Sequence, residues 1–168
     1  MIEEVCIAAQ SGDASRLSAL LEANPQLTNE KNGDGLLPLG MSAHCGRVEA
    51  VRTLLDLGAE VNAMSRSAIS FIPSNTALHA AIAGARNQEV IQLLLERGAN
   101  PGLFDSNGHT CLHVAAMHDD GIEVIRLLLE HGADVNARAE GGDTALSLAL
   151  AQGHRHAAEF LRRNGAKA

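Results

Sequence analysis

The chain has 168 residues, a formal net charge of −7 and only 2% aromatic residues, with no Trp or Tyr. Its length suits one domain. Its acidic balance, without a run of Lys or Arg, argues against a nucleic-acid partner because phosphate contacts need a basic surface. A core with so few large rings predicts thin layers of small, closely packed helices.

The number of cysteines and the absence of a signal-like N-terminal segment bear on the cellular compartment. Cys6, Cys45 and Cys111 are odd in number and far apart, so a disulfide framework is not expected and a reducing compartment fits better. No basic segment with a following apolar run opens the chain, and no stretch approaches the ~18 apolar residues that suggest a membrane span. We therefore expect a cytoplasmic protein, complete from its own Met1, with no membrane partner.

One pattern recurs along the chain. Each copy predicts a short helix rich in small residues, then a second helix rich in Leu, Ile and Val, then a glycine. The glycines of the last four copies follow each other at intervals of 40, 34 and 33 residues: Gly58, Gly98, Gly132 and Gly165. A degenerate copy precedes them. We expect five repeats, with approximate bounds at 1–29, 30–62, 63–100, 101–136 and 137–168.

The ends of the predicted helices carry recognisable signals. Thr76, Thr110 and Thr144 begin the first helices as N-caps, since a Thr hydroxyl accepts from free amides of the first turn. The glycine after each second helix suits a left-handed C′ residue. A helix pair of this size cannot bury its apolar faces alone, so neighbouring pairs must stack.

A period near 33, with Thr-Ala-Leu-His-Ala-Ala at 76–81 and Leu-Leu-Leu-Glu-His-Gly-Ala-Asp-Val-Asn at 127–136, resembles the ankyrin repeat. The resemblance covers nearly the whole chain. It implies an all-α fold with short β-hairpin-like finger loops, a solenoid of stacked helix-turn-helix units. It also implies one domain over 1–168, whose first and last repeats act as polar caps.

Two departures from the repeat stand out. The second repeat has Leu37 and Gly40 where the pattern has the paired Thr and His, and Gly inside that helix costs about 0.5–1 kcal/mol relative to Ala. The third repeat has six extra residues in a finger at 63–75, which carries Phe71 and other apolar residues. This finger either folds back over Leu36–Leu39 or contacts a partner, because an exposed apolar loop is otherwise unfavourable.

The resemblance implies a protein partner, bound on a concave surface of finger tips and first helices by a monomeric adaptor or inhibitor. Met64, Arg66, Phe71 and Met117 are the candidate anchors, because interface centres favour aromatic, Met and Arg side chains. The predicted contact residues are Leu36, His44, Met64, Arg66, Ile69, Phe71, Ile72, Ser106, Asn107, His109, Met117, His118, Glu140, Asp143 and Gln152.

Signs of catalysis are missing from the sequence. There is no nucleophile elbow, P-loop or dinucleotide fingerprint, so we expect neither an enzyme nor a cofactor. His109, His113 and His118 are of the type that binds zinc, which makes a metal- or small-ligand-binding regulatory protein the alternative. We assign no metal ligands, because His113 occupies the same repeat position as His79 and so has a structural explanation.

Overall fold

The computed structural model describes residues 1–167. The chain divides into two compact parts, Met1–Ala99 (the N-terminal part) and Asn100–Ala168 (the C-terminal part), and each is built from helix pairs. Within the described residues, the extended backbone pairs only at an isolated bridge between Arg138 and Thr144. The expected all-α repeat fold is confirmed. Residue 168, the last of the expected fifth repeat, lies outside the described residues.

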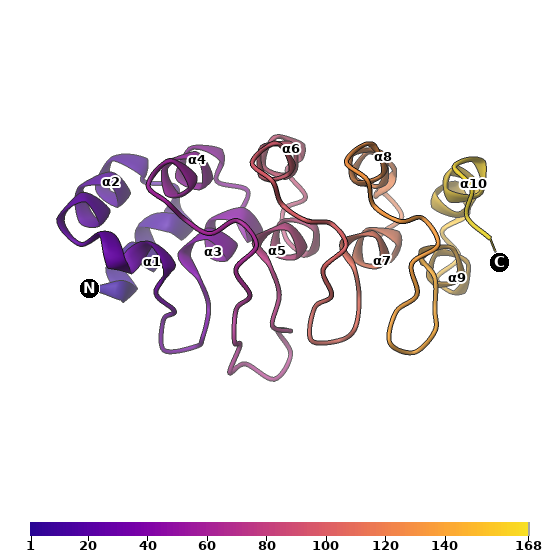
Figure 1. The fold of residues 1–168 in the computed structure, drawn as a ribbon, viewed down its shortest axis with the longest axis horizontal. Coiled ribbons are helices and arrows are strands. Elements are labelled where there is room, and N and C mark those ends of the chain that lie inside the picture. The colour runs from indigo at the N-terminus through magenta and orange to yellow at the C-terminus, as the bar shows by residue number, and fades with distance from the viewer. Residues whose placement is uncertain (168) are drawn as a thin grey trace. The chain divides into compact units, whose positions relative to one another are not determined.

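The N-terminal part contains three helix pairs in two rows. Figure 1 shows the first helices, α1, α3 and α5, in one row and the second helices, α2, α4 and α6, in the other, and contacts join neighbours within each row. A 3-10 turn at Pro25–Asn29 follows α2. The bounds are α1 Ile2–Ser11, α2 Ala14–Ala23, α3 Pro38–His44, α4 Val48–Asp56, α5 Ala77–Ala83 and α6 Gln88–Glu96.

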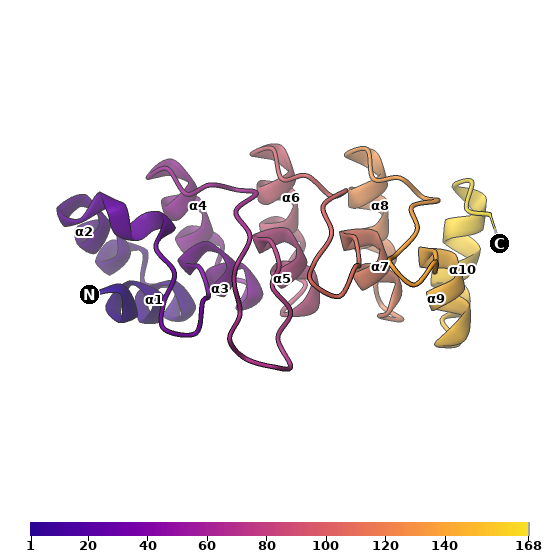
Figure 2. The same ribbon diagram turned by 60° about the horizontal axis from the view of Figure 1, so that its bottom comes forward.

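The C-terminal part repeats this arrangement with two helix pairs. Its helices are α7 Cys111–Ala116, α8 Ile122–Glu130, α9 Ala145–Ala151 and α10 Arg155–Arg163. α7 contacts α9, and α8 contacts α10, and in Figure 2 the two pairs lie side by side. The guanidinium of Arg126 on α8 lies 5.5 Å from the ring centre of Phe160 on α10, a cation–π contact between neighbouring pairs.

Small residues line the first row and larger aliphatic residues fill the second. Ala9, Ala43 and Ala81 on the first helices are fully buried, as are Leu54 and Leu94 on the second helices. Small side chains let the first helices approach closely, and the longer ones fill the space between them and the second row. This packing is the thin-layered core that the composition predicts.

The predicted helix ends are confirmed. Thr76 and Thr144 accept hydrogen bonds from the backbone amides three residues ahead, and Thr110 is also an N-cap residue. The glycines that follow α4, α6, α8 and α10 all have φ near +90°, a conformation that L side chains rarely adopt: Gly58, Gly98, Gly132 and Gly165. The repeat therefore ends each helix pair with the same backbone turn.

A recurring asparagine ties the base of a finger to the turn after the next helix pair. The Asn29 side-chain amide donates to the Gly58 carbonyl at 3.0 Å. Asn62 donates to Gly98 at 3.1 Å, and Asn136 donates to Gly165 at 3.1 Å. These bonds set the distance between neighbouring fingers at their base.

Candidate functional site

An apolar groove lies in the N-terminal part between the first helices and the finger at 63–75. Its volume is about 390 Å³. We call it the N-terminal groove, and we call residues 63–75 the long finger. Three groups of side chains line most of it: Leu36, Leu37, Leu39 and Gly40 at the start of α3; Ala77, Ala80 and Ala83 on α5; and Phe71, Ile72 and Pro73 on the finger.

The groove is open because the facing positions are small. Ala77, Ala80 and Ala83 follow each other at intervals of three on α5, so they share one face of that helix. Across from them, an ideal Cβ built on Gly40 would meet no heavy atom within 4 Å. The alanine face of α5 and the missing side chain at Gly40 therefore leave room for the groove.

Backbone hydrogen bonds hold the long finger in place. The amide of Arg66 donates to the Gly35 carbonyl at 2.8 Å, and the amide of Ala68 donates to the Asp34 carbonyl at 2.9 Å. Gly35 has φ +77°, and a Cβ there would lie 1.8 Å from the Arg66 carbonyl oxygen. The finger is thus anchored along the preceding finger, and only glycine allows that close approach.

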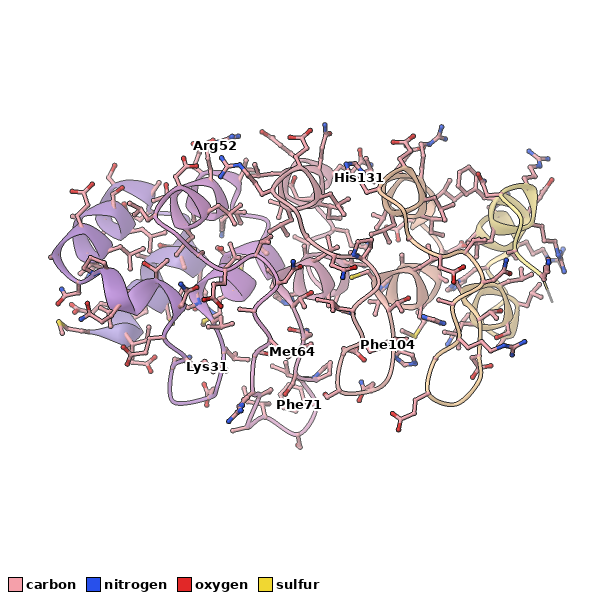
Figure 3. All side chains as sticks on the ribbon, in the orientation of Figure 1. Lys31, Arg52, Met64, Phe71, Phe104 and His131 are labelled. Carbon is pink, nitrogen blue, oxygen red and sulfur yellow. The ribbon has the colours of Figure 1, made fainter. Side chains whose placement is uncertain are left out.

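Ile72 fits the interpretation that the long finger folds back over α3, and Phe71 fits the interpretation that the finger contacts a partner. Ile72 is half-buried and lines the groove together with Leu36 and Leu37, as the fold-back interpretation expects. Phe71 also lines the groove, but 83% of its surface is exposed. Figure 3 shows Phe71 and Met64 on this finger, with Phe71 farther from the helices. The finger covers α3 in part and still presents an aromatic ring to solvent.

The structure brings some predicted contact residues together and leaves others apart. Leu36, Ile72 and Phe71 share the groove with His44, whose Nδ1–H donates to the Ala80 carbonyl at 3.3 Å. The other predicted residues of this part are on the long finger but do not line the groove: Met64, Arg66 and Ile69. Arg66 and Met64 are exposed, and Ile69 is half-buried.

The predicted residues of the C-terminal part lie outside the hollow found in that part. A smaller hollow of about 230 Å³ contains none of them, and it is lined by Pro101, Gly102, Phe104, Thr110, Ala133, Asp134 and Ala137. The exposed predicted residues are Ser106, Asn107, Glu140, Asp143 and Gln152, and the half-buried ones are His109, Met117 and His118. Sequence reasoning missed Phe104, which is 48% exposed.

Both ring nitrogens of His113 form hydrogen bonds within the fold. Its Nε2–H donates to the Asp143 carbonyl at 3.0 Å, and its Nδ1 accepts from the Thr110 amide at 3.2 Å. Burial lowers the pKa of His113, more than the hydrogen bond to Asp143 raises it. The ring of His109 lies 6.0 Å away, between ring centres. Across residues 1–167 no three His, Cys, Asp or Glu side chains are grouped as metal ligands would be.

The three cysteines differ in accessibility. Burial raises the pKa of the Cys6 thiol to about 11, with a smaller contribution from the nearby Glu3 carboxylate, and burial also raises the pKa of Cys111. Cys45 is half-buried and lines the N-terminal groove. All three thiols are free. The groove thus carries the most accessible thiol of the chain.

Sequence reasoning did not place Gly40, Ala77 or Ala80 at the groove. The signal for them was present in the paired loss of Thr and His in the second repeat, which we interpreted only as a weaker helix start.

No helix in the described chain has the length and apolar character needed to cross a membrane.

Known proteins with this pattern support the same fold. The family model for ankyrin repeats (3 copies) matches residues 5–105 and 83–168. The chain is 37% identical over 90 residues to the serine/threonine-protein kinase VIK of Arabidopsis thaliana (54% of this chain, 19% of that protein). It is 36% identical over 110 residues to inversin of Gallus gallus (66% and 9%), and 37% identical over 100 residues to the probable E3 ubiquitin-protein ligase XBOS31 of Oryza sativa subsp. japonica (59% and 21%).

The chain spans a fifth or so of these relatives' length at most, and the likeness to the kinase covers only its repeat region. Ankyrin repeats generally mediate protein–protein interaction and are typically non-enzymatic. With two overlapping matches that together run from residue 5 to residue 168, this chain belongs to the ankyrin-repeat family.

Proposed function

We propose that this chain binds a partner protein through the N-terminal groove and the long finger. The observation that carries the proposal is the apolar groove of about 390 Å³ with Phe71, 83% exposed, at its edge. An exposed aromatic ring beside an apolar hollow is unfavourable in water and typical of an interface centre. A partner that covers both would bury Phe71 and fill the groove together.

The surrounding predicted residues suit the margin of such an interface. Arg66 and Met64 are exposed on the finger, and His44 is exposed at the end of α3. Arg and Met are enriched at interfaces, and polar side chains at the rim fix orientation more than they add affinity. We assign the exposed finger residues of the C-terminal part, such as Ser106 and Glu140, to further polar contacts with the partner.

The role that fits this surface is that of an adaptor or an inhibitor. The chain offers a largely apolar binding surface, so we propose that its effect on a partner is to hold it or to block it. We propose that it acts as a monomer in the cytoplasm; its three free thiols fit a reducing compartment.

The test compares affinity capture by three immobilised forms of the full chain: wild type, Phe71→Ala and Phe104→Ala. Phe104 is the matched control, because it is an exposed phenylalanine that lies outside the groove. We expect partners captured by wild type and Phe104→Ala to be depleted with Phe71→Ala. The unfolding temperature of Phe71→Ala should change little, because the ring is mostly exposed.

Equal capture by wild type and Phe71→Ala would refute the proposal. A large loss of stability in Phe71→Ala, with unchanged capture, would instead support the fold-back interpretation of the finger. Quantitative mass spectrometry of the captured proteins, together with thermal melting of each variant, distinguishes these results.

A further inference from the structure

An asparagine side chain at the base of a finger bridges two backbone groups of the turn that follows the next helix pair. Asn29 donates to the Gly58 carbonyl at 3.0 Å, and its Oδ1 accepts from the Glu60 amide at 2.8 Å. The turn after α4 therefore presents one acceptor and one donor, two residues apart, and a single carboxamide satisfies both.

The same bonds recur at other turns of the chain. Asn136 donates to the Gly165 carbonyl at 3.1 Å, and its Oδ1 accepts from the Lys167 amide at 2.8 Å. A third asparagine, Asn62, donates to the Gly98 carbonyl at 3.1 Å. The chain itself thus identifies the chemical group that fits these turns, which is a primary carboxamide.

The fourth repeat leaves its pair of backbone groups open, because Gly102 takes the place of the asparagine. The corresponding groups are the Gly132 carbonyl and the Asp134 amide. Among the described residues, neither group has a hydrogen-bond partner. The turn itself is unchanged: Gly132 has φ +86°, against +91° at Gly58 and +95° at Gly165. The two groups therefore keep the arrangement that a carboxamide bridges elsewhere.

A hollow of about 230 Å³, which we call the C-terminal hollow, lies at this open pair. Gly102, which lacks the side chain, lines it together with Ala133 and Asp134 of the turn. Gly132 and Asp134 are exposed, so a group from solvent reaches them. The remaining lining residues are Pro101, Phe104, Thr110 and Ala137. The space that an asparagine side chain takes in other repeats is thus open to a ligand here.

The polar side chains that line the hollow favour an uncharged ligand. The Thr110 hydroxyl lies 2.7 Å from His113 Nδ1, so it is already engaged within the fold. The Asp134 carboxylate accepts from the Asn136 amide at 2.9 Å and keeps a negative charge next to the open pair. An anionic ligand would be repelled by this carboxylate, whereas a neutral amide would not.

We propose that the C-terminal hollow binds the side-chain carboxamide of a glutamine or asparagine of a partner protein, which donates to the Gly132 carbonyl and accepts from the Asp134 amide. A carboxylate has no donor for the carbonyl, and an ammonium has no acceptor for the amide. A trans peptide group directs its N–H and C=O in opposite directions, so it does not bridge both groups. The inference goes beyond the proposed function, because neither the N-terminal groove nor Phe71 takes part.

NMR titration of the full chain with N-acetyl-glutamine N-methylamide tests this proposal. We expect the amide signals of Gly102 and Asp134 to shift on binding. Two analogues are the controls: the glutamate compound, and the glutamine compound with two methyl groups on its side-chain nitrogen. Both lack the side-chain donor, so they should bind about tenfold more weakly or worse. Equal affinity for the glutamine compound and its dimethyl analogue would overturn the proposal.

The variant Gly102→Asn should supply the missing carboxamide from the chain itself. We expect it to weaken binding of the glutamine compound about tenfold or more, while the fold becomes more stable. Gly102→Ala is the matched control, because it adds a Cβ without a carboxamide and leaves both backbone groups open. A folded Gly102→Asn chain that binds the compound as wild type does would rule out this site.

Amide hydrogen exchange checks the open pair without any ligand. The Asp134 amide should exchange faster than the Glu60 amide in wild type, because only the latter is bonded to an asparagine. Gly102→Asn should slow exchange at Asp134. Equal protection of the two amides in free wild type would show that the pair is closed and would also overturn the proposal.

Discussion

Gly102 takes the place that Asn62 and Asn136 hold in their repeats, where the asparagine side chain donates to the carbonyl of the glycine after the next helix pair. We expect Gly102→Asn to restore this hydrogen bond in the fourth repeat. Asn136 shows what the tie contributes: its amide donates to the Gly165 carbonyl at 3.1 Å, and its Oδ1 accepts from the Lys167 amide at 2.8 Å. Gly102 occupies the same place in its repeat, so the matching groups are the Gly132 carbonyl and the Asp134 amide.

The backbone at Gly102 already suits an asparagine. Its φ lies outside the left-handed region, so an L side chain is not strained there. A Cβ would lie 3.2 Å from the Asn100 Oδ1, which accepts from the Gly102 amide at 2.9 Å; this contact is tight, and the Asn100 side chain must shift by a few tenths of an ångström. Asn136 occupies the same local turn, since its amide donates to the Asp134 Oδ1 at 2.9 Å. The chain therefore accommodates this side chain in the same turn elsewhere.

The expected gain follows from two contributions. Two hydrogen bonds near the surface contribute about 0.5–1 kcal/mol together, at the low end of the usual range. Replacing glycine adds about 0.4–1 kcal/mol, because the unfolded chain loses conformational freedom. A total of about 1–2 kcal/mol raises the unfolding temperature of a chain of this size by about 2–8 °C.

The assay is urea unfolding followed by circular dichroism, with Gly102→Ala as the matched control. Alanine supplies the entropic contribution without the hydrogen bonds, so the difference between the two variants isolates the side-chain tie. Asn136→Gly should lose a similar amount in the other direction. A Gly102→Asn variant no more stable than Gly102→Ala would refute the reasoning.

Three further changes test other parts of the structure. Gly84→Ala should destabilise the chain by about 1–3 kcal/mol, because its Cβ would lie 2.2 Å from the His44 carbonyl oxygen; urea unfolding measures this. Burial lowers the pKa of His113 in the folded state, so its stabilising contribution is present above about pH 6.5 and is lost as the pH falls through the folded-state pKa; thermal melting between pH 8 and pH 5 should show this fall. Cys45 should react with a thiol reagent at pH 8 well before the two buried cysteines, as mass spectrometry of the labelled chain would show.

Each of these has a control. Gly141→Ala should cost little, because the nearest heavy atom to its Cβ lies at 4.0 Å. His113→Gln should flatten the acid limb of the stability profile, and an unchanged slope would contradict the role assigned to that ring. Cys45→Ser should remove the fast labelling step, and a fast step that survives would place an accessible thiol elsewhere.

The repeat architecture is predictable because it depends on local signals. Thr76 and Thr144 were identified as N-caps from the residue type and its place before small residues, and Gly98 and Gly132 as left-handed turns from their place after an aliphatic ladder. These features rest on hydrogen bonds within a few residues. The left-handed residue Arg86, with φ 50°, was not predicted, because the loop that holds it contains one extra residue and no glycine at that place.

The groove was harder to predict because it depends on what neighbouring segments do. The loss of a histidine at Gly40 is visible in the sequence, but whether the space stays open depends on the side chains that surround it. Here Ala80 on the facing helix is too small to fill it, and the bond from the Arg66 amide to the Gly35 carbonyl fixes the long finger against the preceding finger. An open groove thus needs a small residue on each of two helices and a fixed finger, a combination set by the second and third repeats together. Restoring the Thr–His pair of the other repeats, by Leu37→Thr/Gly40→His, should close the groove without disturbing the stack.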